Sequence, residues 1–289
     1  MDIQNLKHHV QRFYHIGPRN IGHYENLVEA QDYIACQLKN FSAVKLQQFT
    51  AKGKTFCNII GELRGAERPE EVIVVGAHFD TYKNSPGCND NGSALAVLFE
   101  LARYFKSIQF QRTLRLVCFT NSEKPFTRTP KMGSLVYARH CKRNNEKIVS
   151  MVCLEALGCR KEEEGSQRFS FGGFLFPTKG NFLEVVANMP SEPVLRDYLP
   201  KLREKVPIDT KVLPGFLPGV KSSDHWSFWK VGYPAIMLTD TAPLRSPFYH
   251  TRKDTPEKID YDWLSRVGSA IRDSLIDQLG VVESNHLFV

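Results

Sequence analysis

The chain has 289 residues, of which 42% are hydrophobic and 24% are charged, and its net charge at pH 7 is +7. A chain of this length can bury a large core, and its composition excludes a disordered or fibrous protein. Lysine and arginine are scattered, without a basic block interleaved with aromatic residues, so the positive charge does not indicate a nucleic-acid partner.

No apolar run is long enough to span a bilayer, so we expect no membrane association. Residues 1–17 contain no apolar signal core, which favours a cytoplasmic location. The seven cysteines are odd in number and form no CxxC pair, which argues against a disulfide framework. Cys88 lies beside the candidate site described below, and we interpret it as a packed side chain rather than a ligand or a redox group.

Hydrophobic periodicity predicts alternating strands and helices along the first half of the chain. An amphipathic pattern predicts a helix over 24–41, and two short strands follow it, of which the first has the polar character of an edge strand. A continuous β-branched run then predicts a strand that is buried on both faces. The predicted elements are the helix 24–41, strands 44–49, 58–63 and 72–75, helix 94–104, strand 113–120 and helix 133–143.

The second half of the chain continues the alternation. Its predicted elements are strand 149–154, a solvated charged loop 160–165, helices 181–188 and 193–205, a loop 211–221, a short helix 222–230, strand 234–238 and helix 263–279. Such alternation predicts an α/β fold, a three-layer α/β/α arrangement around a mixed, mainly parallel sheet. We find no internal repeat and no dividing linker, so we expect a single domain over 1–289.

Acidic residues and histidines follow the central predicted strands at the point where each strand ends. In open α/β sheets, ligands bind at the carboxyl ends of the strands. Two imidazoles and three carboxylates suit a pair of Zn²⁺ ions, with Co²⁺ or Mn²⁺ as alternatives. The residues of this candidate metal site are His78, Asp90, Glu123, Glu155 and His250.

Eight sequence blocks, in order along 72–260, resemble the zinc aminopeptidases of peptidase family M28. They read GAHFDT, NDNGS, NSEKPF, MGSLVYA, LEALG, SDHWSFW, GYPAIMLTDTA and YHTRKDT. The resemblance implies the zinc-exopeptidase fold and two zinc ions bridged by Asp90. His78 and Glu155 would complete one metal site, and Glu123 and His250 the other.

The same resemblance assigns further roles. Asp80 would not bind metal itself but would orient the ring of His78. Asp224, His225 and Tyr249 would line the substrate site. From the residues alone, it is equally plausible that Asp224 is a helix N-cap and that the aromatic side chains beside it are packed in the core.

One position departs from the family pattern. Ser122 stands where the family has the glutamate that acts as general base, and Lys124 stands where proline is usual. A serine hydroxyl cannot act as a base near neutral pH, and a positioned proton carrier contributes roughly 10²–10⁴-fold in rate. Three explanations stay open: a weakened or retired enzyme, an engineered inactive variant, or a chemistry that does not need this base.

We therefore expect a metal-dependent aminopeptidase that hydrolyses the N-terminal residue of peptides, with Asp80 and Ser122 at its catalytic centre. One alternative is a metal-binding pseudo-peptidase that holds peptides without turnover. Another is acyl transfer of the glutaminyl-cyclase type. The sequence does not predict the side-chain preference or the oligomeric state.

Overall fold

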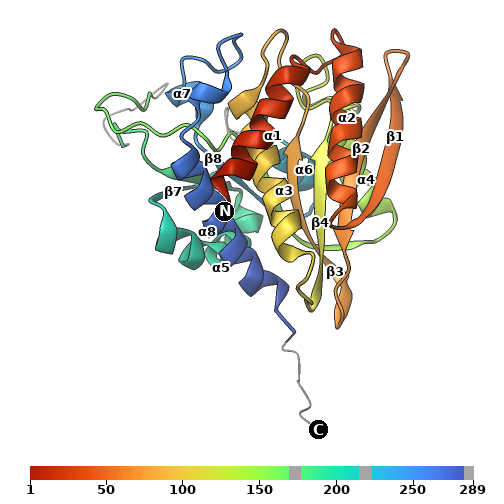
Figure 1. Ribbon diagram of the computed structural model, residues 1–289. Coiled ribbons are helices and arrows are strands. Elements are labelled where there is room, and N and C mark those ends of the chain that lie inside the picture. The colour runs from red at the N-terminus through yellow and green to blue at the C-terminus, as the bar shows by residue number, and fades with distance from the viewer. Residues whose placement is uncertain (169–176, 215–222, 283–289) are drawn as a thin grey trace.

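The computed structural model describes residues 1–168, 177–214 and 223–282 (Figure 1). Its eight strands form one sheet in the order β1-β2-β4-β3-β5-β8-β6-β7. Neighbours are parallel from β4 through β3 and β5 to β8, whereas the pairs β1/β2, β2/β4 and β6/β8 are antiparallel. The predicted mixed, mainly parallel sheet is thereby confirmed. The strands are β1 Ala43–Ala51, β2 Lys54–Leu63, β3 Arg68–His78, β4 Arg112–Phe119, β5 Lys147–Glu155, β6 Leu183–Ala187, β7 Ile208–Val212 and β8 Ala235–Thr239.

Helices cover both faces of the sheet, because successive side chains of the central strands point to opposite faces and are apolar on both. On β3, Ile73 and Val75 enter the larger core, which helices α1, α2, α3, α5 and α8 complete, while Val72 and Val74 enter a smaller core under α4 and α6 (Figure 1). This is the predicted three-layer α/β/α arrangement. The helices are α1 Ile3–Ile16, α2 Tyr24–Lys39, α3 Ala94–Phe105, α4 Gly133–Arg143, α5 Glu192–Lys205, α6 His225–Lys230, α7 Ala242–Arg245 and α8 Tyr261–Leu279, with short turns η1 Cys88–Ser93, η3 Met189–Ser191 and η4 Pro256–Lys258.

The first helix, α1, is not among the predicted elements. The side chain of Asp2 caps it by accepting hydrogen bonds from the backbone N–H groups of Gln4 and Asn5. Leu6, Val10 and Phe13, spaced at helical intervals, are fully buried. The helix therefore belongs to the core and packs against α3 and η1.

The helix predicted over 181–188 is wrong, because the structure has strand β6 there. The run is short and almost wholly apolar, and such a run fits a buried strand as well as a helix. Pairing decides the outcome, since β6 lies between β8 and β7 in the sheet. The loop predicted over 211–221 is also partly wrong, because β7 extends to Val212; residues 215–221 lie outside the described residues.

All seven cysteines are free thiols, and six of them are buried. Cys88 packs in the larger core with no exposed surface, and burial raises the pKa of its thiol. Within the described ranges, no helix is both long and apolar enough to cross a membrane.

Candidate metal centre

The parallel strands bring polar side chains to one edge of the sheet. His78 is the last residue of β3, Glu155 is the last residue of β5, and Glu123 follows β4 by a few residues. His78 lies in register with Phe119 at the end of β4. The three side chains consequently meet at one end of the sheet, as the sequence predicted.

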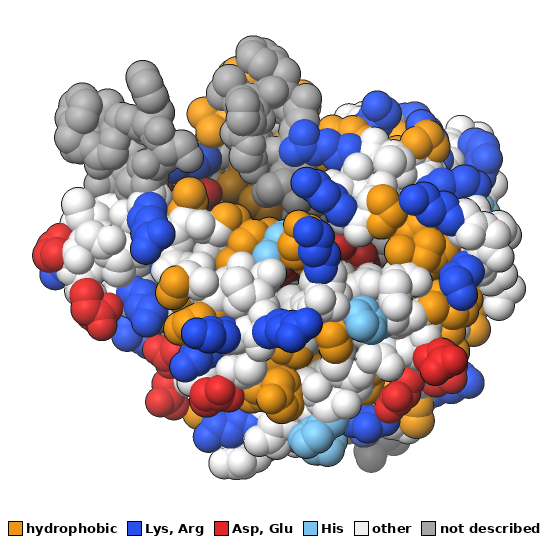
Figure 2. Space-filling view, turned by 90° about the horizontal axis from the view of Figure 1, so that it is seen from above, with side chains coloured by type: hydrophobic (Ala, Val, Ile, Leu, Met, Phe, Trp, Pro, Cys, Tyr) orange, Lys and Arg blue, Asp and Glu red, His pale blue; other side chains and the backbone are white. Residues whose placement is uncertain are grey.

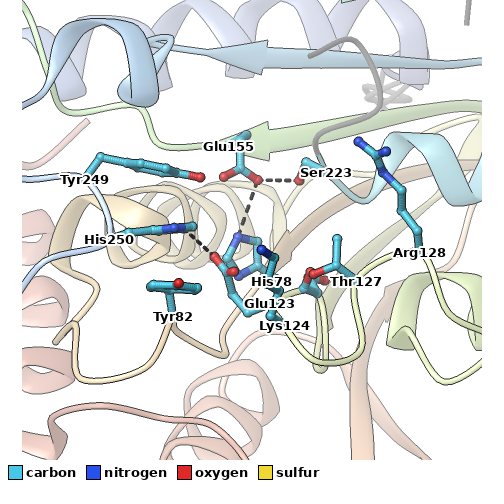
Figure 3. Close-up of a pocket in the computed structure, with 11 residues that line it drawn as sticks. His78, Tyr82, Glu123, Lys124, Thr127, Arg128, Glu155, Ser223, Tyr249 and His250 are labelled. Carbon is cyan, nitrogen blue, oxygen red and sulfur yellow. Dashed lines mark hydrogen bonds and ion pairs between the residues drawn. The ribbon is translucent and has the colours of Figure 1, made fainter. Parts of the chain in front are cut away.

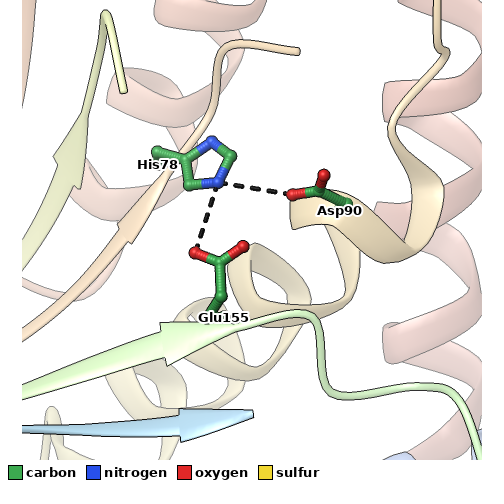
Figure 4. A group of neighbouring side chains, drawn as sticks. All are labelled: His78, Asp90 and Glu155. Atoms are coloured by element: carbon green, nitrogen blue, oxygen red, sulfur yellow. Dashed lines mark ion pairs between the residues drawn. The ribbon is translucent and has the colours of Figure 1, made fainter. Parts of the chain in front are cut away.

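Asp90 joins His78 and Glu155 in a first group of side chains that could hold a metal ion, a candidate metal-ligating group (Figure 4). The Nε2 atom of His78 lies 3.4 Å from Asp90 Oδ1 and 3.4 Å from Glu155 Oε2. Figure 4 shows both carboxylates turned toward this ring nitrogen. Asp90 Oδ1 is buried and accepts no hydrogen bond from the described residues, which leaves a lone pair for a cation.

Asp90 also belongs to a second group, with Glu123 and His250. The Nε2 atom of His250 lies 3.0 Å from Asp90 Oδ2. The same atom lies 2.8 Å from Glu123 Oε1 (Figure 3). The two oxygens of Asp90 thus face different groups. Of the five predicted ligands, none is left outside these two groups.

Backbone contacts hold Asp90 and Glu155 in place. The carboxylate of Asp254 accepts hydrogen bonds from the N–H groups of Asn89, at 2.9 Å, and Asp90, at 3.1 Å. Asn91 donates to the carbonyl of Leu154 and accepts from the N–H of Ala156, so it ties η1 to both neighbours of Glu155. Asp254 is in the YHTRKDT block, but the sequence alone did not indicate this role.

His78 is oriented by its other ring nitrogen. Its Nδ1 lies 3.0 Å from the backbone carbonyl of Asp80, so an Nδ1–H donor leaves the Nε2 lone pair free for a metal. The carboxylate of Asp80 lies farther away, 3.7 Å from Nδ1. It accepts hydrogen bonds from the backbone N–H groups of Ser122, at 3.0 Å, and Glu123, at 2.9 Å. Asp80 therefore positions the loop that carries Glu123 as well as His78.

The charges of this centre suit a bound cation. Burial would lower the pKa of His78, but the carboxylates of Glu155 and Asp90 outweigh it and raise that pKa well above its usual range. Burial would also lower the pKa of His250, but the carboxylates of Asp90 and Glu123 raise it to about 10. Burial raises the pKa of Glu155 to about 7. Three carboxylates this close repel one another, and a divalent cation would remove that repulsion. The donor set of imidazole nitrogens and carboxylate oxygens fits zinc.

Ser122 lines the pocket beside Glu123, and its hydroxyl donates a hydrogen bond of 2.5 Å to Asp224 Oδ1. Asp224 directly precedes α6, but its side chain makes no capping hydrogen bond there. His225 is fully buried, and its ring lies edge-on against Trp229, with 4.5 Å between the ring centroids. Of the three predicted substrate residues, Tyr249 alone is among the described residues that line the pocket.

Two tyrosines enclose the ring of His250. Tyr249 stacks on one face at 3.8 Å between centroids, and Tyr82 on the other at 4.3 Å (Figure 3). Tyr82 was not among the predicted site residues, and its one signal in the sequence is an aromatic residue two positions after the HxD block. Aromatic stacking of this kind restricts the orientation of the imidazole.

The centre opens into a pocket of about 280 Å³. Figure 2 shows acidic and histidine side chains within a hollow on this face, with lysine and arginine side chains around it. The side chains of Lys124, Thr127 and Arg128, from the loop between β4 and α4, line one side of the pocket (Figure 3). The polar lining and the two carboxylate–imidazole groups define the class of site found in metal-dependent hydrolases.

Comparison with known proteins gives the family. Residues 58–275 match peptidase family M28, and the chain belongs to that family. It is 31% identical over 265 residues to the uncharacterized protein YfbL of Escherichia coli, covering 87% of this chain and 80% of YfbL. It is 25% identical over 250 residues to aminopeptidase YwaD of Bacillus subtilis, covering 84% of this chain but about half (49%) of YwaD. The predicted family and the predicted class, a peptidase, are confirmed.

Solved structures agree on the fold. An aminopeptidase from Aneurinibacillus sp. strain AM-1 superposes with a TM-score of 0.72 at 17% identity, covering 95% of this chain and 93% of the other. A glutaminyl cyclase from Porphyromonas gingivalis gives a TM-score of 0.71 at 20% identity, covering 96% and 98%. At these identities the likeness confirms the α/β fold and does not separate the two activities.

Proposed function

We propose that this chain is a zinc-dependent aminopeptidase that acts, as one domain over 1–289, on the N-terminal residue of peptides. The observation that carries the proposal is the sharing of Asp90 by two carboxylate–imidazole groups at the floor of one pocket. Membership of family M28 and the likeness to aminopeptidase YwaD support it.

The residues present would hold two zinc ions. His78 and Glu155 would bind one ion, Glu123 and His250 the other, and Asp90 both. When bound, such ions supply a nucleophile at neutral pH and polarise the carbonyl that it attacks.

The chain's own residues orient this chemistry. Asp80 fixes the backbone that carries Ser122 and Glu123. Tyr82 and Tyr249 stack on the two faces of His250. Both tyrosines also line the pocket, in which the N-terminal end of a peptide would lie beside the metal ligands. Because these side chains are already oriented, less entropy is lost when the transition state forms.

Ser122 favours a second candidate, a metal-binding pseudo-peptidase, because no carboxylate occupies the position of the family's general base. The third candidate, a glutaminyl-cyclase-like acyltransferase, is supported by the fold alone. We rank it last, since the full set of five ligands is present in this chain.

The test combines metal analysis with a substrate panel. We expect about two zinc ions per chain in purified protein, with the content reduced in His78→Ala and most strongly in Asp90→Ala. We expect hydrolysis of aminoacyl-arylamides and no cyclisation of a peptide with N-terminal glutamine. Unchanged metal content in both variants would refute the metal site. Full metal content without any hydrolysis would favour the pseudo-peptidase, and cyclisation would favour the acyltransferase.

A further inference from the structure

The buried carboxyl group of Asp224 does not line the pocket, but it is hydrogen-bonded to the hydroxyl of Ser122, which does. Asp224 has no exposed surface, whereas Ser122 lines the pocket at 8% exposure. The Ser122 hydroxyl donates to Asp224 Oδ1 at 2.5 Å, at the short end of the usual range for a hydrogen bond between a hydroxyl and a carboxylate. Asp224 Oδ2 is buried and has no hydrogen-bond partner among the described residues.

The position of Asp224 is not explained by local structure. It sits where an N-cap of α6 would sit, yet its side chain makes no cap and turns toward Ser122, 102 positions away in sequence. A buried carboxylate oxygen without a hydrogen bond costs stability, so the retention of Asp224 at this position calls for an explanation.

The other acidic groups at the pocket have different tasks. Asp90, Glu123 and Glu155 belong to the candidate metal-ligating groups, and both oxygens of Asp80 accept backbone N–H groups. Among the described acidic residues in contact with the pocket lining, this leaves Asp224 as the candidate proton acceptor, reached through Ser122.

We infer that Ser122 and Asp224 form a proton relay for the reaction of this pocket. The inference rests on the proposed peptidase function. As the attacking water loses a proton to Ser122 Oγ, the hydroxyl proton of Ser122 passes to Asp224 Oδ1. The water oxygen bonds to the scissile carbonyl carbon, and when the C–N bond breaks the proton returns by the same path to the leaving nitrogen.

The electrostatic surroundings of Asp224 suit this role. Burial raises the pKa of Asp224, while His78 and the hydroxyls of Ser122 and Ser134 oppose that rise and Glu123 adds to it. A carboxylate whose pKa is raised is a stronger base than an exposed aspartate.

Two variants remove the relay in different places. Asp224→Asn keeps the shape and removes the acceptor, and Ser122→Ala removes the link. We expect each to lower kcat on an aminoacyl-arylamide by ~10²-fold or more, with KM and zinc content unchanged. The double variant should be no slower than either single one, because both changes break one path. Ser122→Thr, which keeps a hydroxyl, should recover at least about tenfold in kcat over Ser122→Ala.

Ser150→Ala is the matched control, since Ser150 is a buried serine on β5 that contacts Tyr198 away from the pocket. It should leave kcat unchanged. A second readout needs no turnover. In metal-free protein labelled with ¹³C at aspartate carboxyls, Ser122→Ala should shift the resonance that disappears in Asp224→Asn, and Ser150→Ala should not.

The outcomes separate the relay from the proposed function. If the wild type hydrolyses arylamides and Asp224→Asn stays within twofold of it, the relay is wrong and the peptidase proposal stands. Equal losses in kcat and zinc content in the variants would also overturn the relay, since they indicate a structural role. If the zinc-loaded wild type hydrolyses no arylamide, the peptidase proposal fails and the relay fails with it.

Discussion

Ser122 is the residue that distinguishes this site from the pattern of family M28 that it resembles. Its hydroxyl lies at the pocket wall next to Glu123 and is engaged with Asp224. A glutamate at this position would place a carboxylate directly at the pocket, in place of a hydroxyl backed by a buried acid. In the proposed mechanism, the residue at this position would decide how a proton is carried, and the candidate metal ligands would stay as they are.

The substitution Ser122→Glu replaces the hydroxyl at this position by a carboxylate and so tests whether a missing base limits the rate. We expect turnover of arylamides to rise, by up to ~10²–10⁴-fold where the serine contributes nothing and by less where the Asp224 relay already carries the proton. Metal content should barely change, because Ser122 is outside both metal-ligating groups. Lys124 lines the same pocket, so its ammonium can attract the new carboxylate away from the water.

The double variant Ser122→Glu with Lys124→Pro covers that case. Steady-state kinetics and zinc analysis on the parent and both variants are sufficient. If neither variant exceeds the parent while both keep their metal, the account based on a missing base is wrong.

At the scale of elements, the loop after β4 is held by close contact with the start of α4. The N–H of Gly133 donates to the carbonyl of Thr120, and Asn58 donates to the carbonyl of Gly133. A Cβ atom at Gly133 would lie 2.2 Å from the Thr120 carbonyl oxygen and 2.4 Å from Asn58 Oδ1. The loop that carries Ser122 and Glu123 is therefore anchored at a position where only glycine fits.

We expect Gly133→Ala to lower the free energy of unfolding by roughly 1–3 kcal/mol and to reduce zinc content, because the start of the site loop must move. Denaturant unfolding and metal analysis measure the two effects. Gly22→Ala is a suitable control, since a Cβ there would meet one side-chain atom, Asn20 Oδ1, at 3.2 Å. Equal zinc content in Gly133→Ala and the wild type would show that this contact does not position the loop.

Most elements could be predicted from their apolar pattern, but helix α1 was missed although its buried residues have helical spacing, and the short strands β6 and β7 were misassigned. The alternation of buried strands with amphipathic helices was sufficient for the layers, and the predicted bounds 133–143 coincide with α4. The strand β6 was misread as a helix because its side chains, apart from Glu184, are apolar on both faces, and the polar strand β7 was partly assigned to a loop. Both strands are defined by their pairing partners, which local periodicity does not contain.

The same limit applies to the site. The candidate ligands follow predicted strand ends and sit in recognisable blocks, so the sequence could group them. The contacts of Ser122 with Asp224, of Asp254 with η1 and of Tyr82 with His250 join segments that are distant in the chain. Only the folded arrangement places these side chains together.

At the scale of the whole molecule, buried acids make stability depend on pH. Asp240 has no exposed surface, and burial raises its pKa from 3.8 to about 7, against the attraction of Arg245 and with the repulsion of Asp254. The folded state then binds more protons than the unfolded state between these two values. The contribution of Asp240 to stability is full below pH 3.8 and is lost as the pH rises through about 7.

Asp240→Asn removes this dependence while keeping an oxygen that can accept from Asn89 and the N–H of Cys159. We expect the variant to gain roughly 1 kcal/mol or more in unfolding free energy relative to the wild type when the pH is raised from 5 to 8. Urea unfolding of metal-free protein at both values checks it. A difference between variant and wild type that is the same at both pH values would contradict the expectation.

The sharing of Asp90 between the two metal-ligating groups has a consequence for how metal is acquired. Two ions that use separate ligands would load independently, each with its own simple saturation curve. Here the first ion to arrive would fix the carboxylate that the second requires, so it would lower the entropy cost of the second while its charge repels it. The two occupancies would therefore be linked, and by reciprocity each ion would alter the affinity of the other by the same factor.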